Sequence, residues 1–129
     1  MDRNRQYHTI APVYDERSRL LILGSFPSVK SRETAFYYGH PQNRFWRVLA
    51  SVLGESVPQT VEEKKAMLLR RGVALWDVIA SCEIEGSSDA SIAEVEPNDL
   101  GKILNGTKVH RIFCNGGTAL RYYKKYCQA

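Results

Sequence analysis

Residues 20–46 read LLILGSFPSVKSRETAFYYGHPQNRFW, and this stretch decides the fold class of the chain. It begins with residues 20–23, an uninterrupted apolar run of the kind that forms a strand covered on both faces. Gly24 ends the run. Ligands bind at the carboxyl ends of strands in open parallel α/β sheets, so the loop that starts at Gly24 is the first place to look for a functional site.

The rest of the chain continues an alternation of helices and strands. Residues 43–53 place apolar side chains at helical spacing before Gly54, and Thr60 with Glu63 forms a capping-box pattern for a helix that reaches residue 71. Two further apolar runs predict strands at 73–78 and 109–113, with a helix opening at 97–100 between them. Strands that alternate with helices indicate an α/β fold with a parallel sheet.

Composition is consistent with one compact domain over residues 1–129. The net charge of +4 is enough to favour a polyanionic partner without identifying one. The sequence has no apolar run long enough to cross a bilayer and no signal-peptide pattern at its start, so we expect no membrane partner and an intracellular, cytoplasmic protein.

Cysteine usage argues against a disulfide framework and against a metal centre. Cys82, Cys114 and Cys127 are scattered, odd in number and without a C-x-x-C pair. An iron–sulfur cluster normally takes four thiolates, so three dispersed cysteines do not suit one. We therefore expect reduced thiols, no metal and no cofactor.

Two motifs carry a family resemblance. Residues 24–28, GSFPS, followed by residues 37–46, YYGHPQNRFW, resemble the uracil-DNA glycosylase superfamily, most closely its deoxyinosine (hypoxanthine) branch. The resemblance continues through residues 76–78, WDV, and 113–116, FCNG, and so covers nearly the whole chain. It implies a three-layer sandwich around a central parallel sheet of strand order 2-1-3-4. It also implies a base-excision repair enzyme, a monofunctional DNA glycosylase that flips a deaminated base out of the helix and hydrolyses its N-glycosidic bond.

The chain departs from the family pattern at two points. Mismatch-specific relatives have an Asn that positions the attacking water at the third position of the first motif, where this chain has Phe26, which cannot hydrogen-bond water. Relatives also continue past the last helix into a fourth strand and a DNA-contacting loop. We therefore expect a C-terminally truncated domain that self-associates through an exposed edge at 109–113 or is marginally stable, and that excises poorly. The alternative is that residues 7–14 cover that edge, which Pro12 disfavours for a paired central strand.

The catalytic candidates are Asn43 and His40. The resemblance places Asn43 at the sugar side of the flipped nucleotide, where an amide orients water and stabilises charge rather than abstracting a proton. Asn43 is equally suited to be a helix N-cap, and the two roles are compatible. His40 can donate to the leaving base or to a phosphate, or it can be an inert turn residue beside Pro41.

Four residues are candidates for contacting the base. Asn115 can accept N1–H of hypoxanthine through its carbonyl while its amide donates to O6, although an Asn-Gly turn would need the same residue. Asp77 lies where the resemblance implies a base-binding polar residue, and a turn or helix cap is its alternative role. Phe26 and Tyr38 can stack on the two faces of the base, although aromatic residues in such a run are more often core.

Backbone contacts to DNA are expected from four residues around the two motifs, each of which is individually more often a solvated surface residue. They are Ser28, Lys30, Ser31 and Arg44.

Two other classes of function fit the same residues. One is an inactive or non-catalytic nucleic-acid-binding fragment of this fold. The other is a nucleobase-binding or nucleoside-hydrolysing α/β domain that does not use DNA. The resemblance does not rank hypoxanthine, uracil and xanthine as substrates.

Overall fold

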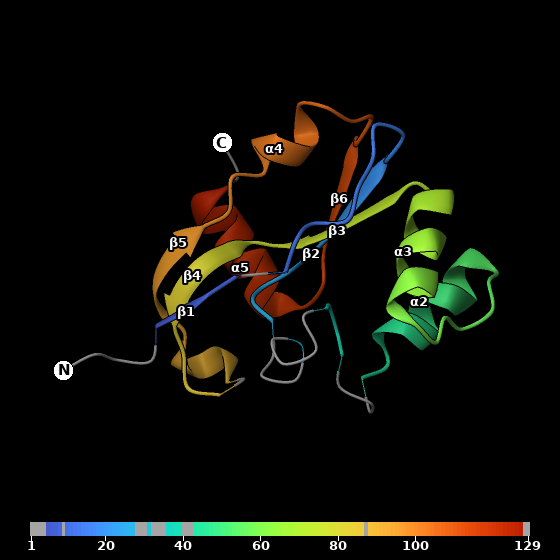
Figure 1. Ribbon diagram of the computed structural model, residues 1–129. Helices are drawn as coiled ribbons and strands as arrows, with labels where there is room; N and C mark the ends of the chain where they lie inside the picture. Colours follow the sequence, from blue (N-terminus) through green and yellow to red (C-terminus); the bar gives the residue numbers. More distant parts are fainter. Residues whose placement is uncertain are drawn as a thin grey trace.

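A parallel three-stranded sheet forms the centre of the protein in the computed structural model, which describes residues 5–8, 10–27, 31, 36–39, 43–86 and 88–127 (Figure 1). Its strands are β2 (Leu20–Gly24), β3 (Val73–Asp77) and β6 (Arg111–Cys114), in the order β3-β2-β6. The family resemblance implies this order, in which β2, the first strand of the parallel sheet along the chain, lies between the second and the third. The last strand begins at Arg111 rather than at residue 109, which lies outside the ladder.

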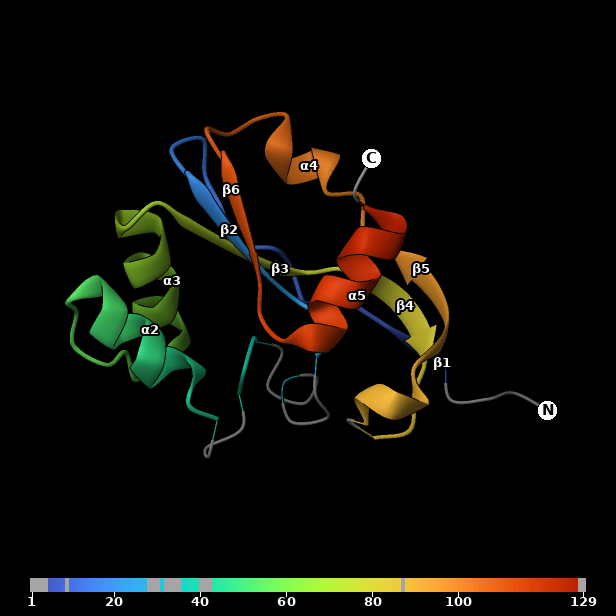
Figure 2. The same ribbon diagram turned by 180° about the vertical axis from the view of Figure 1, so that it is seen from behind.

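Helices cover both faces of this sheet. The helices α2 (Phe45–Leu53) and α3 (Val61–Arg70) lie on one side, and α5 (Gly117–Tyr126) lies on the other, as both views show (Figures 1 and 2). A short helix, α4 (Gly101–Leu104), precedes β6. The predicted α/β sandwich of three layers is therefore the observed architecture.

The helix boundaries follow local signals in the sequence. Gly54 ends α2 in the left-handed region at φ 70°, where a glycine carries no steric penalty. The Thr60 hydroxyl accepts the Glu63 N–H at 3.0 Å, as a capping box requires. The Glu63 carboxylate accepts the N–H of Gln59 at 3.0 Å, so the return bond is made one residue earlier than the motif predicts.

A second, antiparallel sheet was not predicted from the sequence. It consists of β1 (Arg5–Tyr7), β4 (Ile79–Glu83) and β5 (Ala93–Pro97), in the order β1-β4-β5, and a 3₁₀ turn at Asp89–Ser91 precedes β5. These strands are three to five residues long and two of them are largely polar, so they lack the apolar pattern that identifies a strand. One residue, Val78, separates β3 from β4, and this long segment serves both sheets (Figure 1).

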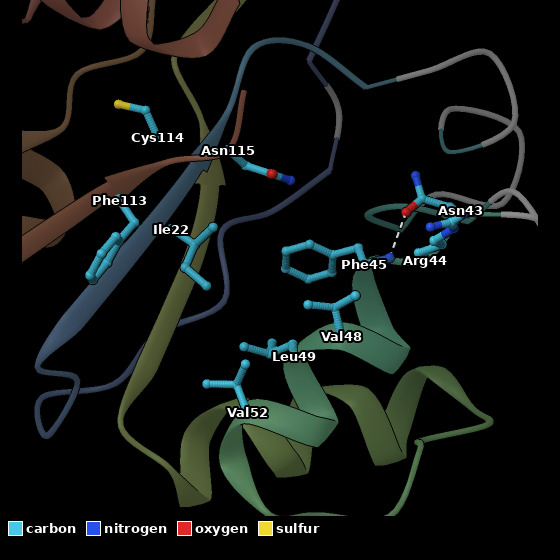
Figure 3. Close-up of a pocket in the computed structure, with 10 residues that line it drawn as sticks. All are labelled: Ile22, Asn43, Arg44, Phe45, Val48, Leu49, Val52, Phe113, Cys114 and Asn115. Carbon is cyan, nitrogen blue, oxygen red and sulfur yellow. Dashed lines mark hydrogen bonds between the residues drawn. The ribbon is translucent and has the colours of Figure 1, made fainter. Parts of the chain in front are cut away.

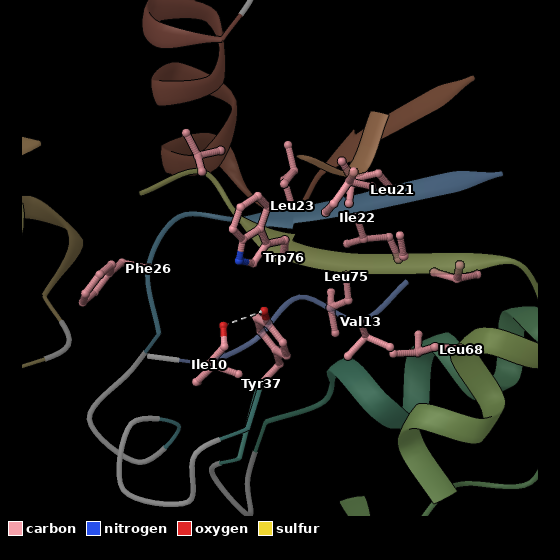
Figure 4. Close-up of a cluster of buried hydrophobic side chains, with 14 of the residues drawn as sticks. Ile10, Val13, Leu21, Ile22, Leu23, Phe26, Tyr37, Leu68, Leu75 and Trp76 are labelled. Carbon is pink, nitrogen blue, oxygen red and sulfur yellow. Dashed lines mark hydrogen bonds between the residues drawn. The ribbon is translucent and has the colours of Figure 1, made fainter. Parts of the chain in front are cut away.

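The core lies between the parallel sheet and its helices (Figure 4). The last four residues of β2 and the whole of β3 are buried, in agreement with strands covered on both faces. The largest fully buried apolar side chains include Leu21, Leu23, Met67, Leu68 and Leu75. A rigid core of this kind fixes the strand ends, where the polar residues gather.

The N-terminal segment lies against β3 and not against β6. Val13 and Leu75 exchange two backbone hydrogen bonds of 3.0 and 2.9 Å in an antiparallel bridge. The described part of this segment therefore does not pair with the last strand, which was the alternative that Pro12 disfavoured. In the part of the chain that the structure describes, β6 pairs with β2 on one side only.

The remaining expectations concern thiols and membranes. Cys82, Cys114 and Cys127 form no disulfide bond within the described residues. No helix within the described ranges has the length and apolar character needed to cross a membrane.

Candidate functional site

Three strand ends bring the polar residues of the site together. Gly24 of β2 is the register partner of Asp77 of β3, and Leu23 is the partner of Cys114, the residue before Asn115. The Asn115 N–H extends the ladder by donating to the Leu23 carbonyl at 2.7 Å. Parallel pairing thus places Gly24, Asp77 and Asn115 side by side at the carboxyl ends of the strands, where ligands bind in this fold class.

The close approach of Asp77 explains why residue 24 is glycine. A β-carbon at Gly24 would collide with Oδ1 of Asp77 and would lie 2.8 Å from the Tyr38 hydroxyl. The Asp77 side chain is 4% exposed, and its backbone carbonyl accepts the Asn98 side-chain amide at 2.9 Å. The carboxylate is therefore fixed directly above the end of β2.

Two tyrosines come from the loop between β2 and α2. The Tyr37 hydroxyl donates to the Ala11 carbonyl at 2.9 Å, and the Trp46 indole donates to the Tyr37 carbonyl at 3.1 Å. Tyr38 adopts φ 53°, a left-handed conformation that is strained for an aromatic residue, and its ring stacks on Phe45 with centroids 4.0 Å apart. One face of the Tyr38 ring is therefore covered by Phe45, and only the other face is left for a ligand.

The Tyr38 hydroxyl faces the strand ends. The side-chain amide of Asn115 donates to it at 3.1 Å. Burial raises the pKa of Tyr38, the charge of Asp77 raises it further, and the bond from Asn115 opposes these effects. The hydroxyl consequently remains protonated at neutral pH and can donate a hydrogen bond.

A cavity of about 210 Å³ lies within this arrangement. It is smaller than the roughly 300–1,000 Å³ of sites for drug-sized ligands and suits a single planar ring system. Its described lining comes from the first motif, the loop before α2 and the ends of β3 and β6. The residues are Gly24, Ser25, Phe26, Pro27, Ser31, Tyr37, Tyr38, Asn43, Asp77 and Asn115.

A second cavity of about 420 Å³ adjoins the first and is mainly apolar (Figure 3). Ile22, Phe45, Val48 and Phe113 line its walls, and Asn43 and Asn115 line both cavities. The buried carboxylate belongs to the smaller cavity alone. We therefore place the chemistry in the smaller cavity, with the two asparagines at the boundary.

Asn43 makes a turn at the start of α2. Its Oδ1 accepts the N–H of Phe45 at 2.8 Å, and Arg44 is the formal N-cap, without a side-chain bond (Figure 3). Asn43 therefore binds a backbone N–H at the start of the helix, as a cap does, but from the position one residue before the N-cap. Because the oxygen is held by Phe45, the amide NH₂ is the group directed away from the helix and available to a ligand.

The structure brings six of the predicted site residues to the wall of the smaller cavity. They are Phe26, Ser31, Tyr38, Asn43, Asp77 and Asn115. Three predicted residues, Ser28, Lys30 and His40, lie outside the described residues.

The remaining two residues predicted to contact the DNA backbone differ in exposure. Ser31 is buried, and its hydroxyl accepts the Gly39 N–H at 3.0 Å within the cavity wall. Arg44 is exposed at the mouth of the larger cavity, where a phosphate can reach it.

Sequence reasoning missed His8. Its Nε2 lies 2.8 Å from Oδ2 of Asp77, and the two side chains are 2% and 4% exposed. A single histidine after a short polar strand has no recognisable motif. The pairing of β1 with β4 brings it to the site, because the His8 N–H donates to the Ala80 carbonyl at 2.7 Å.

Within the described ranges, no group of three or more His, Cys, Asp and Glu side chains is arranged to hold a metal ion. The polar groups on the described wall of the smaller cavity are hydroxyl, amide and carboxylate groups, which suit hydrogen bonding to a polar ring.

Comparison with known proteins gives consistent relatives. A curated hypoxanthine DNA glycosylase of Methanosarcina acetivorans is 38% identical over 112 residues, covering 85% of this chain and 71% of the relative. A hypoxanthine DNA glycosylase of Methanosarcina barkeri is 41% identical over 90 residues, covering 69% of this chain and 57% of the relative. This chain therefore spans less than two thirds of the length of the second relative.

A solved structure shares the fold. The solution NMR structure of a Methanosarcina acetivorans protein assigned to the uracil DNA glycosylases superposes with a TM-score of 0.79 at 36% identity, over 90% of this chain and 73% of that one. The sequence pattern of the Uracil DNA glycosylase superfamily matches residues 11–129. Because this match covers nearly the whole chain and includes every described residue that lines the cavity, the chain belongs to the uracil DNA glycosylase superfamily.

Proposed function

We propose that this protein is a DNA glycosylase that removes hypoxanthine, and with it other deaminated bases such as uracil or xanthine, from DNA. The observation that carries the proposal is the cavity at the carboxyl ends of the parallel strands. It combines a buried carboxylate at Asp77, the amides of Asn43 and Asn115, and the ring of Tyr38 in a space of about 210 Å³. The names of the two relatives support hypoxanthine as the base.

The reaction divides the site into a base side and a sugar side. As the C1′–N9 bond breaks, positive charge develops on the sugar and the bonding electrons move to the base. Water adds to C1′, and its proton ends on the released base. Asp77 and Asn115, at the strand ends, are proposed to contact the base, while Asn43, at the start of α2, is proposed to orient the water.

The chemistry proposed for Asn43 follows from its hydrogen bond. Its oxygen is held by Phe45, so the amide NH₂ can hold the water oxygen in position for attack on C1′. Phe26, at the position where mismatch-specific members of the superfamily have an Asn, lines the cavity, and its ring offers only an apolar surface. None of the described lysines lines this cavity, and a hydrolytic, monofunctional reaction is proposed accordingly.

DNA reaches the site from the surface around Arg44. This side chain is exposed beside the cavities and is proposed to contact a phosphate, together with Ser28 and Lys30. The net charge of +4 favours association with a polyanion. Action on chromosomal DNA would place the protein in the cytoplasm with the nucleoid.

The test is release of free base from a duplex that contains a single deoxyinosine. Matched duplexes carrying deoxyuridine, deoxyxanthosine or deoxyadenosine at the same position rank the substrates and provide the negative control. Release of hypoxanthine, with an alkali-labile abasic site left in the strand, supports the proposal. Salt-sensitive duplex binding without base release contradicts it and favours a non-catalytic nucleic-acid-binding protein.

A further inference from the structure

His8 and Asp77 form a buried pair behind the cavity. The imidazole Nε2 lies 2.8 Å from the carboxylate Oδ2. The pair joins the two sheets, since His8 follows β1 and Asp77 ends β3. A carboxylate oxygen in such a contact accepts, so Nε2 carries the hydrogen of the imidazole.

The His8 ring is fixed in place by aromatic neighbours. Its centroid lies 6.1 Å from that of Phe26 and 6.4 Å from that of Trp76, both in edge-to-face geometry, and 6.0 Å from that of Tyr37. The backbone N–H of His8 is bonded to Ala80. The imidazole therefore has little freedom to turn away from Asp77, and the carboxylate cannot rotate without breaking the bond.

The second oxygen of Asp77 is directed to the cavity side. Oδ1 occupies the space above Gly24, and Asp77 lines the cavity although its side chain is only 4% exposed. Among the residues that the structure describes, Oδ1 makes no hydrogen bond, whereas Oδ2 is held by His8. Asp77 consequently presents one fixed and unpartnered acceptor to a ligand in the cavity.

We infer that His8 is a positioning residue that holds Asp77 as an acceptor for the ring N–H which deamination creates in a base. The inference rests on the proposed function and adds to it the basis of base selection. Deamination of adenine converts N1 from an acceptor into N1–H, and deamination of cytosine does the same at N3. A fixed acceptor therefore bonds hypoxanthine and uracil and repels the ring nitrogen lone pair of their parent bases.

The hydrogen bond from His8 is needed for this selection. An N–H donor on Oδ2 keeps Oδ1 aimed at the cavity, where it accepts from a ring N–H and repels a ring nitrogen lone pair. Guanine and thymine carry a ring N–H of their own, so the pair separates hypoxanthine from adenine and uracil from cytosine, but it does not separate xanthine from guanine.

The pair also changes the role expected of Asn115. The sequence suggested that Asn115 alone bonds both N1–H and O6 of hypoxanthine. In the structure its amide donates to Tyr38, and Asn115 lies exposed at the rim while Asp77 lies buried. Asp77 therefore takes N1–H, and the second amide hydrogen of Asn115 is left to donate to O6.

The first experiment measures base binding without turnover. Free hypoxanthine, adenine and 1-methylhypoxanthine are titrated into the full chain and followed by amide chemical shifts in NMR spectra. We expect the wild-type protein to bind hypoxanthine about tenfold or more tightly than adenine or the methylated base. A difference of this size is typical of well-placed hydrogen bonds to a base. Equal binding of the three bases, or no binding of any, overturns the inference.

Matched variants assign this preference to His8. His8→Gln can place an amide N–H near the position of Nε2, whereas the shorter side chain of His8→Asn cannot reach Asp77. We expect the preference to survive in His8→Gln and to be lost in His8→Asn. His8→Phe keeps an aromatic ring against its neighbours and should also lose the preference. If His8→Phe does not fold, the Gln and Asn variants still decide, and equal preference in both overturns the inference.

A double-mutant cycle separates positioning from packing. Single-turnover excision from a deoxyinosine duplex is measured for His8→Asn, for Asp77→Asn and for the double variant, alongside their melting temperatures. If His8 acts through Asp77, the double variant is no slower than Asp77→Asn. Additive losses overturn the inference. A wild-type protein that binds hypoxanthine selectively but releases no base refutes the proposed activity and leaves the His8 assignment intact.

Discussion

The side-chain amide of Asn115 donates to the hydroxyl of Tyr38 at 3.1 Å, although the two residues are 77 positions apart in the sequence. Asn115 follows the last strand of the parallel sheet, and Tyr38 lies in the loop before α2. The bond orients an amide that would otherwise be free to rotate at an exposed strand end. An asparagine reads a base only when its donor and acceptor are oriented, so this contact would link the loop to the base recognition that we propose for Asn115.

Asn115→Asp removes that oriented donor. The new carboxylate would accept from Tyr38 and would repel O6 of hypoxanthine. We expect single-turnover excision of hypoxanthine to fall about tenfold or more, because a donor to O6 is replaced by a group that repels it. Tyr38→Phe, which removes only the partner hydroxyl, should cause a smaller loss. An unchanged rate in Asn115→Asp would remove Asn115 from the site.

Asn43→Ala tests the catalytic assignment. Loss of the oxygen that accepts the Phe45 N–H should cost about 0.5–2 kcal/mol of stability, and loss of the NH₂ should abolish single-turnover excision at unchanged duplex affinity. Asn43→Ser is the matched control, since its hydroxyl can still accept a helix N–H but offers no amide. We expect Asn43→Ser to recover the melting temperature and not the chemistry. Full activity in a folded Asn43→Ala protein would leave Asn43 as a structural residue only.

Gly24→Ala tests the close approach at the end of β2. The added methyl group would displace Oδ1 of Asp77 and the Tyr38 hydroxyl together. We expect loss of excision and a lower melting temperature. Gly106→Ala is the control, because a β-carbon there meets no atom within 4 Å. Normal activity in Gly24→Ala would show that the carboxylate need not occupy this position.

Self-association is expected through the exposed side of β6. Phe113 is 54% exposed, and Val48 and Val52 of the adjoining cavity are 57% and 76% exposed. An apolar strand that is paired on one side invites pairing with a second chain. Light scattering should therefore give a mass that rises with concentration, and Phe113→Ser should lower it. Leu120→Ser, which changes an equally apolar residue of α5 that is 42% exposed, serves as the control. A concentration-independent monomer mass would contradict this expectation.

The acid stability of the protein should depend on Glu55. Hydrogen bonds from Arg70 and Arg71, both 2.7 Å at their shortest, lower the pKa of Glu55 from 4.5 to about 2. A depressed pKa in the folded state gives stability that is present above pH 4.5 and is lost as the pH falls toward about 2. Thermal melts of the wild-type protein and Glu55→Gln should therefore differ at neutral pH and converge near pH 2. A pH-independent difference would show that the ion pairs contribute nothing.

The sequence by itself predicted the parallel sheet, and the family resemblance predicted its strand order and several of the residues that line the cavity. The apolar run at 20–23, the helix signals at Gly54 and Thr60 and the two family motifs are local patterns, and local patterns are readable because strand burial and helix capping depend on near neighbours. Asn43, Asp77 and Asn115 were identified because each follows or begins such an element.

Only the tertiary structure decided which atoms of these residues meet. The strands β1 and β5 of the antiparallel sheet are short and largely polar. They form a sheet because each pairs with β4, and no local sequence pattern identifies them as strands. That pairing carries His8 to Asp77 across 69 positions and buries both side chains. The orientation of the carboxylate above Gly24 and the stacking of Tyr38 on Phe45 have the same origin. Contacts between residues so far apart in sequence form only once the core has fixed the strand ends, so periodicity and motif spacing cannot reveal them.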